Sequence, residues 1–259
     1  MLAPVTIVCD LDGVIWLGDR PIPGSAAAVA TLRATGQRFL FVTNNSFATA
    51  RDVEAKLASF GIPAAGDVVT SGRAAATLVA PGERVLLCAG PGAAEELTAA
   101  GAVLIDGAAP DGDEPVDSVV VGFHRSFDYE EMRRAATAVR GGARLLATND
   151  DATYPTPDGP IPGGGAILAG IATAAGRTPL VAGKPYEPMA ALVRSLVPDA
   201  IADVVMVGDR LDTDGRFAVT IGCRYALVLT GETTAREVPT DPAPAFVAAD
   251  LAALVDLLH

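Results

Sequence analysis

IVCDLDGVIW, residues 7–16, carries two acidic side chains at the end of an apolar run that is typical of a buried strand. Asp10 and Asp12 are separated by one leucine and are followed at once by a glycine. Alternate residues of a strand point to the same side, so both carboxylates are able to face one reacting centre. Each charge makes ionisation of the other less favourable, so the placement of two aspartates this close together calls for a chemical explanation. Two such carboxylates can divide catalytic work, one as an ionised nucleophile and the other as a general acid.

Strand-like apolar runs alternate with helical patterns along the whole chain. Strands are predicted at 5–9, 38–45, 203–209, 224–231 and 246–250, and helices at 25–36, 48–61 and 188–196. Continuous apolar runs between helices indicate a parallel sheet that is covered on both faces. We therefore predict an α/β fold whose core is a Rossmann-like, doubly wound parallel sheet.

Residues 81–180 repeat this alternation by themselves. Turn-rich segments near Pro81 and Gly176 suit domain boundaries, and about 100 residues is a normal size for a domain. We predict that residues 1–80 and 181–259 form the core domain. Residues 81–180 are predicted to form a second α/β domain, a cap inserted between the two halves of the first.

The composition excludes several classes of partner. The chain has 259 residues, of which 19% are charged, with a net charge of −12. So acidic a chain lacks the basic surface that nucleic acids need, and it binds an anion only through local donors or a metal. No basic region followed by an apolar stretch opens the sequence, and no apolar run reaches membrane-spanning length. We expect a cytoplasmic protein with neither a nucleic-acid nor a membrane partner.

Polar residues follow three of the predicted strands. Thr43 and Asn44 follow RFLFV, and Asp209 follows DVVMVG, as Asp10 follows VTIVC. Ligands of open parallel sheets bind beyond the carboxyl ends of the strands, so we expect these groups to meet at one edge. Asp209 and Asp214, in VGDRLDTD, add carboxylates close to the first pair. Oxygen ligands without a histidine or cysteine cluster favour Mg²⁺.

A phosphate group would also need donors at this edge. Thr43 offers a hydroxyl group, and the backbone N–H groups of Asn44 and Asn45 lie just past a strand end. Only two of the 19 lysine and arginine residues are lysines, Lys56 and Lys184. The compact charge of Lys184, in AGKPYEP, suits a phosphate oxygen and a neighbouring carboxylate.

Each of these motifs also has an ordinary structural interpretation. Surface carboxylates, a turn at TNN, a solvated lysine and an acidic helix N-terminus would explain them one at a time. Their occurrence together, in this order and at strand ends, favours one site that binds a phosphate and a divalent cation.

DLDGVIW, VTNNS, GKP and VGDRLDTD resemble the four motifs of the haloacid dehalogenase superfamily of phosphohydrolases. The GDRLDTD form and the long insert resemble the NagD-like, or nitrophenylphosphatase-type, subfamily. The resemblance spans nearly the whole chain, because ATNDDATYPTPDG and PIPGGGAI are similar to segments of the subfamily's cap.

The resemblance implies that Asp10 attacks phosphorus and forms an aspartyl-phosphate. Asp12 would protonate the leaving alcohol and then deprotonate the hydrolytic water. Mg²⁺ would be held by the Asp10 carboxylate, the Asp12 backbone carbonyl and Asp209, with Asp214 just outside them. Thr43, together with Asn44 and Lys184, would bind the transferred phosphoryl group.

The cap is expected to close over the strand ends and to select the leaving group. His124 stands where relatives more often carry aspartate; it is interpreted either as a specificity residue or as part of a surface turn. Tyr154 follows the TNDD loop, where pyridoxal-phosphate phosphatases place a histidine that contacts substrate. It is interpreted either as a substrate contact or as loop packing.

Together these features predict a Mg²⁺-dependent phosphomonoesterase that acts on a small phosphorylated metabolite. A phosphoryl-transfer mutase and a catalytically silent binding protein on the same scaffold are the alternatives. Phosphoglycolate, glycerol phosphate, pyridoxal phosphate, sugar phosphates and nucleotides all stay open as substrates. Because relatives often dimerise through the cap, a homodimer stays open too.

Overall fold

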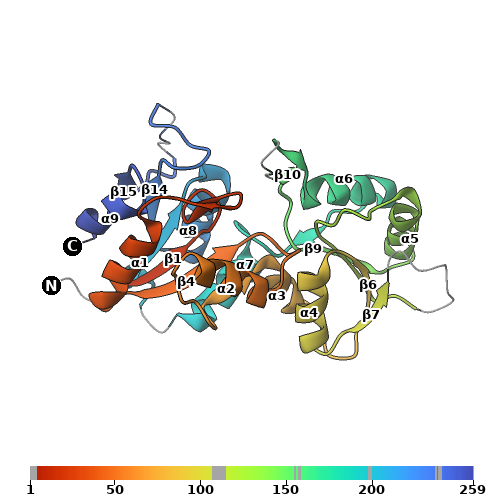
Figure 1. Cartoon of the computed structure of the whole chain (residues 1–259). Helices are drawn as coiled ribbons and strands as arrows, with labels where there is room; N and C mark the ends of the chain where they lie inside the picture. Colours follow the sequence, from red (N-terminus) through yellow and green to blue (C-terminus); the bar gives the residue numbers. More distant parts are fainter. Residues whose placement is uncertain are drawn as a thin grey trace. The chain divides into compact units, whose positions relative to one another are not determined.

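The computed structural model describes residues 5–106, 115–154, 156, 159–197, 200–236, 238 and 241–258. The chain folds as two compact units, each built from separate stretches of sequence (Figure 1). The first unit comprises Met1–Thr43, Arg51–Val69 and Lys184–His259. The second comprises Asn44–Ala50 and Thr70–Gly183.

The first unit contains a six-stranded sheet in the order β15-β14-β13-β1-β4-β5. Its strands are β1 (Thr6–Cys9), β4 (Arg38–Thr43), β5 (Val68–Thr70), β13 (Val204–Gly208), β14 (Arg224–Val228) and β15 (Phe246–Ala248). The central strand β1 runs parallel to both of its neighbours, β13 and β4. All four of its residues are buried, which is why the sequence TIVC is apolar and β-branched rather than alternating.

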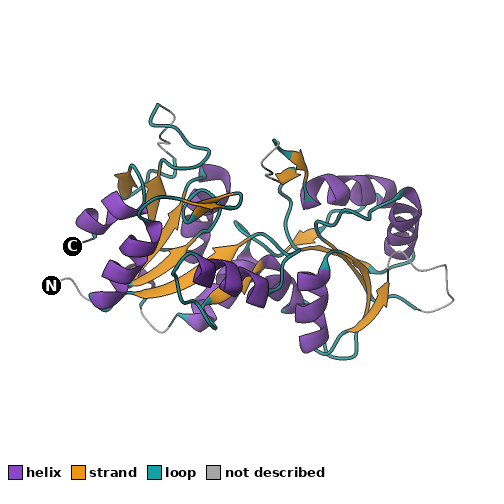
Figure 2. Ribbon diagram, viewed as in Figure 1, coloured by secondary structure: helices purple, strands orange, loops and turns teal. Residues whose placement is uncertain are grey.

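Helices lie along both faces of this sheet (Figure 2). They are α1 (Ser25–Ala34), α2 (Ala50–Ser59), α7 (Glu187–Leu196), α8 (Arg216–Ile221) and α9 (Leu251–Leu257). Helix α1 packs against α9, and α7 packs against α8. A short hairpin of β2 (Trp16–Leu17) and β3 (Arg20–Pro21) follows β1. A 3-10 turn (Ile201–Asp203) precedes β13, and a wide π turn (Leu211–Gly215) follows it.

The register of the central strands brings their carboxyl ends level. Cys9 of β1 is paired with Phe41 of β4 on one side and with Val207 of β13 on the other. The residues that follow these three positions therefore emerge at the same edge of the sheet. This edge receives Asp10, Thr43 and Asp209, as the sequence predicted.

The second unit has its own parallel sheet, in the order β12-β9-β8-β6-β7. Its strands are β6 (Arg84–Cys88), β7 (Val103–Asp106), β8 (Ser118–Val121), β9 (Arg144–Ala147) and β12 (Leu180–Val181). Helices α3 (Ser71–Ala76) and α4 (Pro91–Ala99) pack together, as do α5 (Tyr129–Arg140) and α6 (Gly164–Ala175). A small antiparallel pair, β10 (Thr153–Tyr154) and β11 (Ile161–Pro162), completes the unit.

The predicted α/β class, with a doubly wound parallel core and a second α/β unit, is confirmed. The second unit takes in more sequence than the expected range of 81–180. Its longer stretch starts at Thr70 because α3 packs on α4, and it extends to Gly183 because β12 pairs with β9. It also includes Asn44–Ala50, a segment that no composition shift marks.

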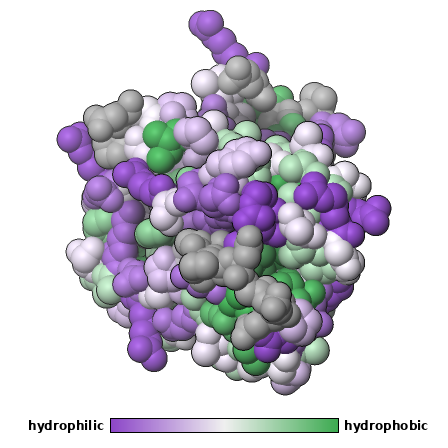
Figure 3. All heavy atoms as spheres, turned by 90° about the vertical axis from the view of Figure 1, so that its right-hand side faces the viewer, coloured by the Kyte–Doolittle hydropathy of each residue, from purple (hydrophilic) through white to green (hydrophobic). Residues whose placement is uncertain are grey.

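No helix in the described part of the chain is long and apolar enough to cross a membrane. One face of the molecule is shown in Figure 3; hydrophilic side chains cover much of it, and hydrophobic ones gather in limited areas. Exposed large hydrophobic residues of the second unit include Val103 on β7 and Leu180 on β12, the two outer strands of its sheet.

Candidate active site

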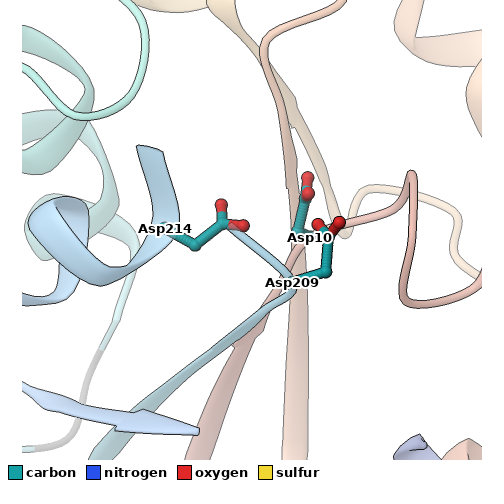
Figure 4. Close-up of side chains that lie close together, drawn as sticks. All are labelled: Asp10, Asp209 and Asp214. Carbon is teal, nitrogen blue, oxygen red and sulfur yellow. The ribbon is translucent and has the colours of Figure 1, made fainter. Parts of the chain in front are cut away.

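Three aspartates of the first unit meet beyond the carboxyl ends of β1 and β13. Asp10 directly follows β1, Asp209 directly follows β13, and Asp214 lies in the π turn that comes next. Each offers a carboxylate oxygen, and these oxygens lie within 4.8 Å of one another. Figure 4 shows Asp10 and Asp209 side by side, with the carboxyl group of Asp214 directed toward them. Residues separated by about two hundred positions therefore form one acidic cluster, as predicted.

Lys184 lies among these carboxylates and joins two of them. Its Nζ atom donates to Asp10 Oδ1 and to Asp214 Oδ1, each at 2.7 Å. The residue is 2% exposed, so the solvated alternative for this lysine is wrong. Burial lowers the pKa of Lys184, but the charges of the two aspartates more than offset this and hold the pKa above its usual value. Lys184 is therefore a fixed positive charge at neutral pH.

The carboxylates are themselves under electrostatic strain. Burial, reinforced by the charges of Asp214 and Asp10, raises the pKa of Asp209 to about 8. Burial and the charge of Asp10 raise the pKa of Asp214 to about 7, against the opposing effect of Lys184. Burial also raises the pKa of Asp10, again against Lys184. One ammonium group is thus too little positive charge for three buried acids.

Glycines allow the backbone to approach these carboxyl groups closely. A Cβ atom at Gly13 or at Gly231 would overlap the carboxyl group of Asp209, and one at Gly208 would overlap that of Asp214. Gly13 also has a φ of 81°, in the left-handed region that glycine adopts without a steric penalty. Side chains are therefore excluded at these three glycine positions. Backbone N–H groups reach the oxygen cluster instead, as when Glu232 donates to Asp209 Oδ2 at 2.7 Å.

This donor set fits a hard divalent cation. It consists of carboxylate oxygens, and the described residues place no histidine or cysteine in the group. Mg²⁺ prefers such oxygen ligands and binds through few carboxylates, keeping several of its waters. Burial and neighbouring negative charge raise the pKa values of Asp209 and Asp214, and a dication would compensate that negative charge.

Asp12 has a different environment from Asp10. Its side chain is half-buried, and its Oδ1 atom accepts a hydrogen bond from the indole Nε1–H of Trp16 at 2.9 Å. Burial raises the pKa of Asp12, whereas the bond from Trp16 and the charge of Lys56 oppose the increase. The ammonium group of Lys56 lies 4.3 Å from the centre of the Trp16 ring. The two aspartates of the DLD motif thus have separate partners, as a division of roles requires.

The TNN segment crosses from one unit to the other. Thr43 ends β4 in the first unit and is 3% exposed. Asn44 begins the next stretch of the second unit, and its Nδ2 atom donates to Asp151 Oδ2 at 2.9 Å. The side chain of Asn45 accepts from the backbone N–H of Phe47 at 2.9 Å, which is the hydrogen bond of an asparagine turn. The turn interpretation of TNN is therefore correct, and it is compatible with a role for the backbone N–H groups.

Tyr154 packs within the second unit. Its ring stacks on Phe123 with a centroid distance of 4.4 Å and an interplanar angle of 4°. Its hydroxyl oxygen accepts from Asn45 Nδ2 at 3.3 Å. Packing thus accounts for part of its environment, and the hydrogen bond links β10 to the TNN segment.

His124 is buried in the second unit, so its interpretation as a surface-turn residue is wrong. Its Nε2 atom lies 3.0 Å from the carboxylate of Glu131, and its Nδ1 atom lies 3.2 Å from the carbonyl oxygen of Gly122. Both ring nitrogens face acceptors, which favours the doubly protonated imidazolium. Burial lowers the pKa of His124, but the contacts with Glu131 and Gly122 and the charge of Glu131 together outweigh burial, and the net change is upward. These contacts favour a structural role over a substrate contact.

Comparison with known proteins agrees with this geometry. The family model described as haloacid dehalogenase-like hydrolase matches residues 7–103, and one described as HAD-hydrolase-like matches residues 181–254. An acid sugar phosphatase of Staphylococcus saprophyticus is 36% identical over 91% of this chain and 90% of its own length. The chain belongs to the haloacid dehalogenase-like hydrolases.

Solved structures of this family have the same fold over nearly the whole chain. The 4-nitrophenylphosphatase of Thermotoga maritima superimposes with a TM-score of 0.89 at 34% identity, covering 99% of this chain and 98% of its own. A glycerol phosphate phosphatase of Mycobacterium tuberculosis, solved in complex with magnesium, gives a TM-score of 0.86 at 34% identity, with coverages of 97% and 77%. The resemblance to nitrophenylphosphatase-type members is confirmed, and the chain is a phosphatase of this family.

Three residues that contact the predicted site residues were not assigned a role from the sequence. Trp16 and Lys56 contact Asp12 or its hydrogen-bond donor, and Asp151 holds the side chain of Asn44. The composition could have drawn attention to two of them, because Trp16 is the single tryptophan of the chain and Lys56 is one of its two lysines. Asp151 lies in the quoted TNDD segment, but spacing alone does not connect it to a residue 107 positions away.

We predict that Mg²⁺ stabilises the chelator-treated protein through Asp209. A cation that binds only the folded state raises the melting temperature, here by about 3 °C or more at saturating Mg²⁺. Asp209→Asn should abolish this increase, because it removes one of three clustered carboxylates. The matched control is Asp212→Asn, since Asp212 lies in the same turn but is exposed and paired with Arg210. An equal Mg²⁺ effect on wild type and Asp209→Asn, measured by differential scanning fluorimetry, would contradict this assignment.

We also predict a pH-dependent contribution of His124 to stability. Because the folded pKa of His124 lies above its unfolded value, its contribution is complete below about pH 6.5 and disappears as the pH rises through the folded pKa. His124→Gln should therefore lower the free energy of unfolding by about 3 kcal/mol at about pH 6, and by clearly less at about pH 9. Urea unfolding at both pH values tests this, with Glu131→Gln as the partner variant. A loss that does not vary with pH would exclude the charged pair.

Proposed function

We propose that this phosphatase is a Mg²⁺-dependent phosphomonoesterase that acts through an aspartyl-phosphate on Asp10. The observation that carries the proposal is the buried arrangement in which Lys184 joins Asp10 to Asp214, with Asp209 in the same cluster. It combines a nucleophile, a fixed cation and a set of oxygen ligands at the carboxyl end of a parallel sheet.

In the first step, Asp10 attacks phosphorus, and the bond between phosphorus and the ester oxygen breaks. Asp12 gives its proton to that oxygen, so that the product leaves as a neutral alcohol. In the second step, Asp12 takes a proton from water, which attacks phosphorus and releases inorganic phosphate from Asp10. The environments of the two aspartates support this division, because Asp10 accepts a hydrogen bond from the ammonium group of Lys184, whereas Asp12 accepts one from the indole N–H of Trp16.

Donors at the strand ends would bind the transferred phosphoryl group. Lys184 is already held at the nucleophile, and Thr43 ends the neighbouring strand β4. The backbone N–H groups of Asn44 and Asn45 follow directly in the chain. Phosphoryl transfer is catalysed largely by such positioning and charge stabilisation, so these groups have the chemistry that the reaction needs.

The cation would be held by the carboxylates of Asp10 and Asp209 and by the backbone carbonyl of Asp12, with Asp214 beside them. When bound, Mg²⁺ supplies a positive charge that screens the phosphate from the acidic cluster and polarises a phosphate oxygen. The magnesium complex of the Mycobacterium tuberculosis glycerol phosphate phosphatase supports the choice of metal.

We propose small alkyl phosphates, namely sugar phosphates or glycerol phosphate, as the substrate class. Relatives are named acid sugar phosphatase and glycerol phosphate phosphatase. An alkoxide is a poor leaving group, so a general acid such as Asp12 is needed for this class. The second unit is proposed as the cap that selects the leaving group, with Tyr154 as the candidate contact. Phosphate release from a panel of phosphorylated metabolites tests the class.

The mutase alternative is not favoured by the fold. A small helical cap would be expected of the superfamily's mutases, whereas the second unit contains a five-stranded parallel sheet. The silent binding protein would be expected to have lost Asp10, Asp12 or Lys184, and all three are present.

Asp10→Asn is expected to reduce phosphate release by roughly 10³-fold or more, because the amide is a poor nucleophile. The variant should remain folded, since it removes one negative charge from a crowded cluster. Asp256→Asn, an exposed position on α9, serves as the matched control. Substantial activity in Asp10→Asn, with circular dichroism unchanged, would defeat the nucleophile assignment.

Removal of divalent cations is expected to abolish turnover of 4-nitrophenyl phosphate, and added Mg²⁺ should restore it. The reason is that a phosphate dianion is repelled by the acidic cluster unless a cation compensates for it. Rates are measured before and after EDTA treatment and after back-titration with Mg²⁺. Activity that is indifferent to the chelator would refute the proposed metal.

A further inference from the structure

We infer that Trp16, held in place by Lys56, is a positioning residue that aligns Asp12 for proton transfer to the leaving group. The inference rests on the proposed function, in which Asp12 is the general acid. Trp16 does not touch the reacting atoms in this scheme. It acts through one hydrogen bond to the carboxyl group that does.

The hydrogen bond is part of a tightly folded loop. Trp16 begins β2, four residues after Asp12, and its backbone carbonyl accepts from the N–H of Gly13 at 2.8 Å. Its own backbone N–H donates to the carbonyl of Leu11 at 3.2 Å. The indole ring is 4% exposed, and its Nε1–H donates to Asp12 Oδ1 at 2.9 Å. The loop after the nucleophile therefore returns to place a donor on the second aspartate.

Helix α2 fixes the ring from outside this loop. The Nζ atom of Lys56 lies 4.3 Å from the ring centre, within the range of a cation–π interaction. The same atom donates to the carbonyl oxygen of Gly18, at the tip of the hairpin, at 2.7 Å. Phe60, the residue directly after α2, meets the ring edge-on at a centroid distance of 6.0 Å. Two side chains from one segment thus contact the indole.

The chemical consequence concerns which oxygen of Asp12 carries the proton. An indole N–H is a donor only, so its partner oxygen acts as the acceptor. With Oδ1 occupied by Trp16, the proton that Asp12 delivers is carried by Oδ2. The contact also restricts rotation of the carboxyl group, which otherwise presents either oxygen. Trp16 therefore leaves Asp12 one orientation of its carboxyl group instead of two. This orientation affects the rate only when Asp12 must deliver a proton.

The effect of a Trp16 substitution on kcat/KM should depend on the leaving group of the substrate, and this dependence distinguishes a positioning role from a structural one. An alkoxide leaving group needs the proton of Asp12 as its bond to phosphorus breaks, whereas 4-nitrophenolate leaves readily without it. The ratio kcat/KM reports steps up to release of the leaving group, so it excludes hydrolysis of the aspartyl-phosphate. A general loss of folded enzyme would lower kcat/KM equally for both kinds of substrate.

The test compares wild type with Trp16→Phe, which keeps a buried aromatic ring but removes the N–H donor. The substrates are glycerol 3-phosphate, glucose 6-phosphate and 4-nitrophenyl phosphate, with saturating Mg²⁺. We expect the fall in kcat/KM to be about tenfold larger for the alkyl phosphates than for 4-nitrophenyl phosphate. Lys56→Met should show the same selectivity to a smaller degree, and Lys56→Arg should largely restore wild-type behaviour because it keeps the cation over the ring. Leu17→Ala, an exposed position in the same hairpin, is the control and should show no selectivity.

Asp12→Asn distinguishes failure of this inference from failure of the proposed function. If Asp12→Asn is selective for alkyl phosphates but Trp16→Phe and Lys56→Met are not, the positioning role is overturned and Asp12 remains the acid. If Asp12→Asn itself affects all substrates equally, the proposed acid is wrong. Should Trp16→Phe fold poorly, Lys56→Met decides, because Lys56 is partly exposed and its replacement leaves the indole in the core.

Discussion

The buried ammonium of Lys184 is the interaction on which the site depends. It joins Asp10 to Asp214 at 2.7 Å on each side, in surroundings where an unpaired charge would be strongly destabilising. The aspartates belong to segments that follow different strands, so their approach is possible only if the strands stand in one register. Burial and mutual repulsion oppose the cluster, as the raised pKa values of Asp209 and Asp214 indicate. The fold therefore holds acids together that would separate if they were free.

This arrangement explains how an acidic chain can handle a phosphate. With a net charge of −12, the protein repels anions at long range, so attraction has to be local. Lys184 provides a permanent charge, and under the proposed function the surplus of carboxylates would hold a dication. The glycines around the cluster leave room for backbone donors in place of side chains. Charge excess and close backbone approach both oppose stability, and both serve the chemistry we propose.

Much of the fold and part of the site could be predicted from the sequence. Apolar runs and helical periodicity identify the strands, and the position of polar residues after those strands identifies Asp10 and Asp209 as neighbours. Other features escaped prediction. His124 was expected either to set specificity or to lie in a surface turn, but it is buried, and Glu131 in the first turn of α5 supplies its partner. The longer stretch of the second unit begins at Thr70 rather than at residue 81, because the packing of α3 on α4 extends it past the turn-rich segment near Pro81.

The sequence by itself determined the class of fold, the order of the motifs and the types of chemical group at the strand ends. It did so because periodicity and residue type are local properties of the chain. Only the tertiary structure decided which groups are partners. Lys184 pairs with two aspartates, Trp16 donates a hydrogen bond to Asp12, and the ammonium group of Lys56 lies over the Trp16 ring. Such pairings depend on strand register, on the close approach that glycines permit and on the return of loops, and these arise only when distant segments pack together.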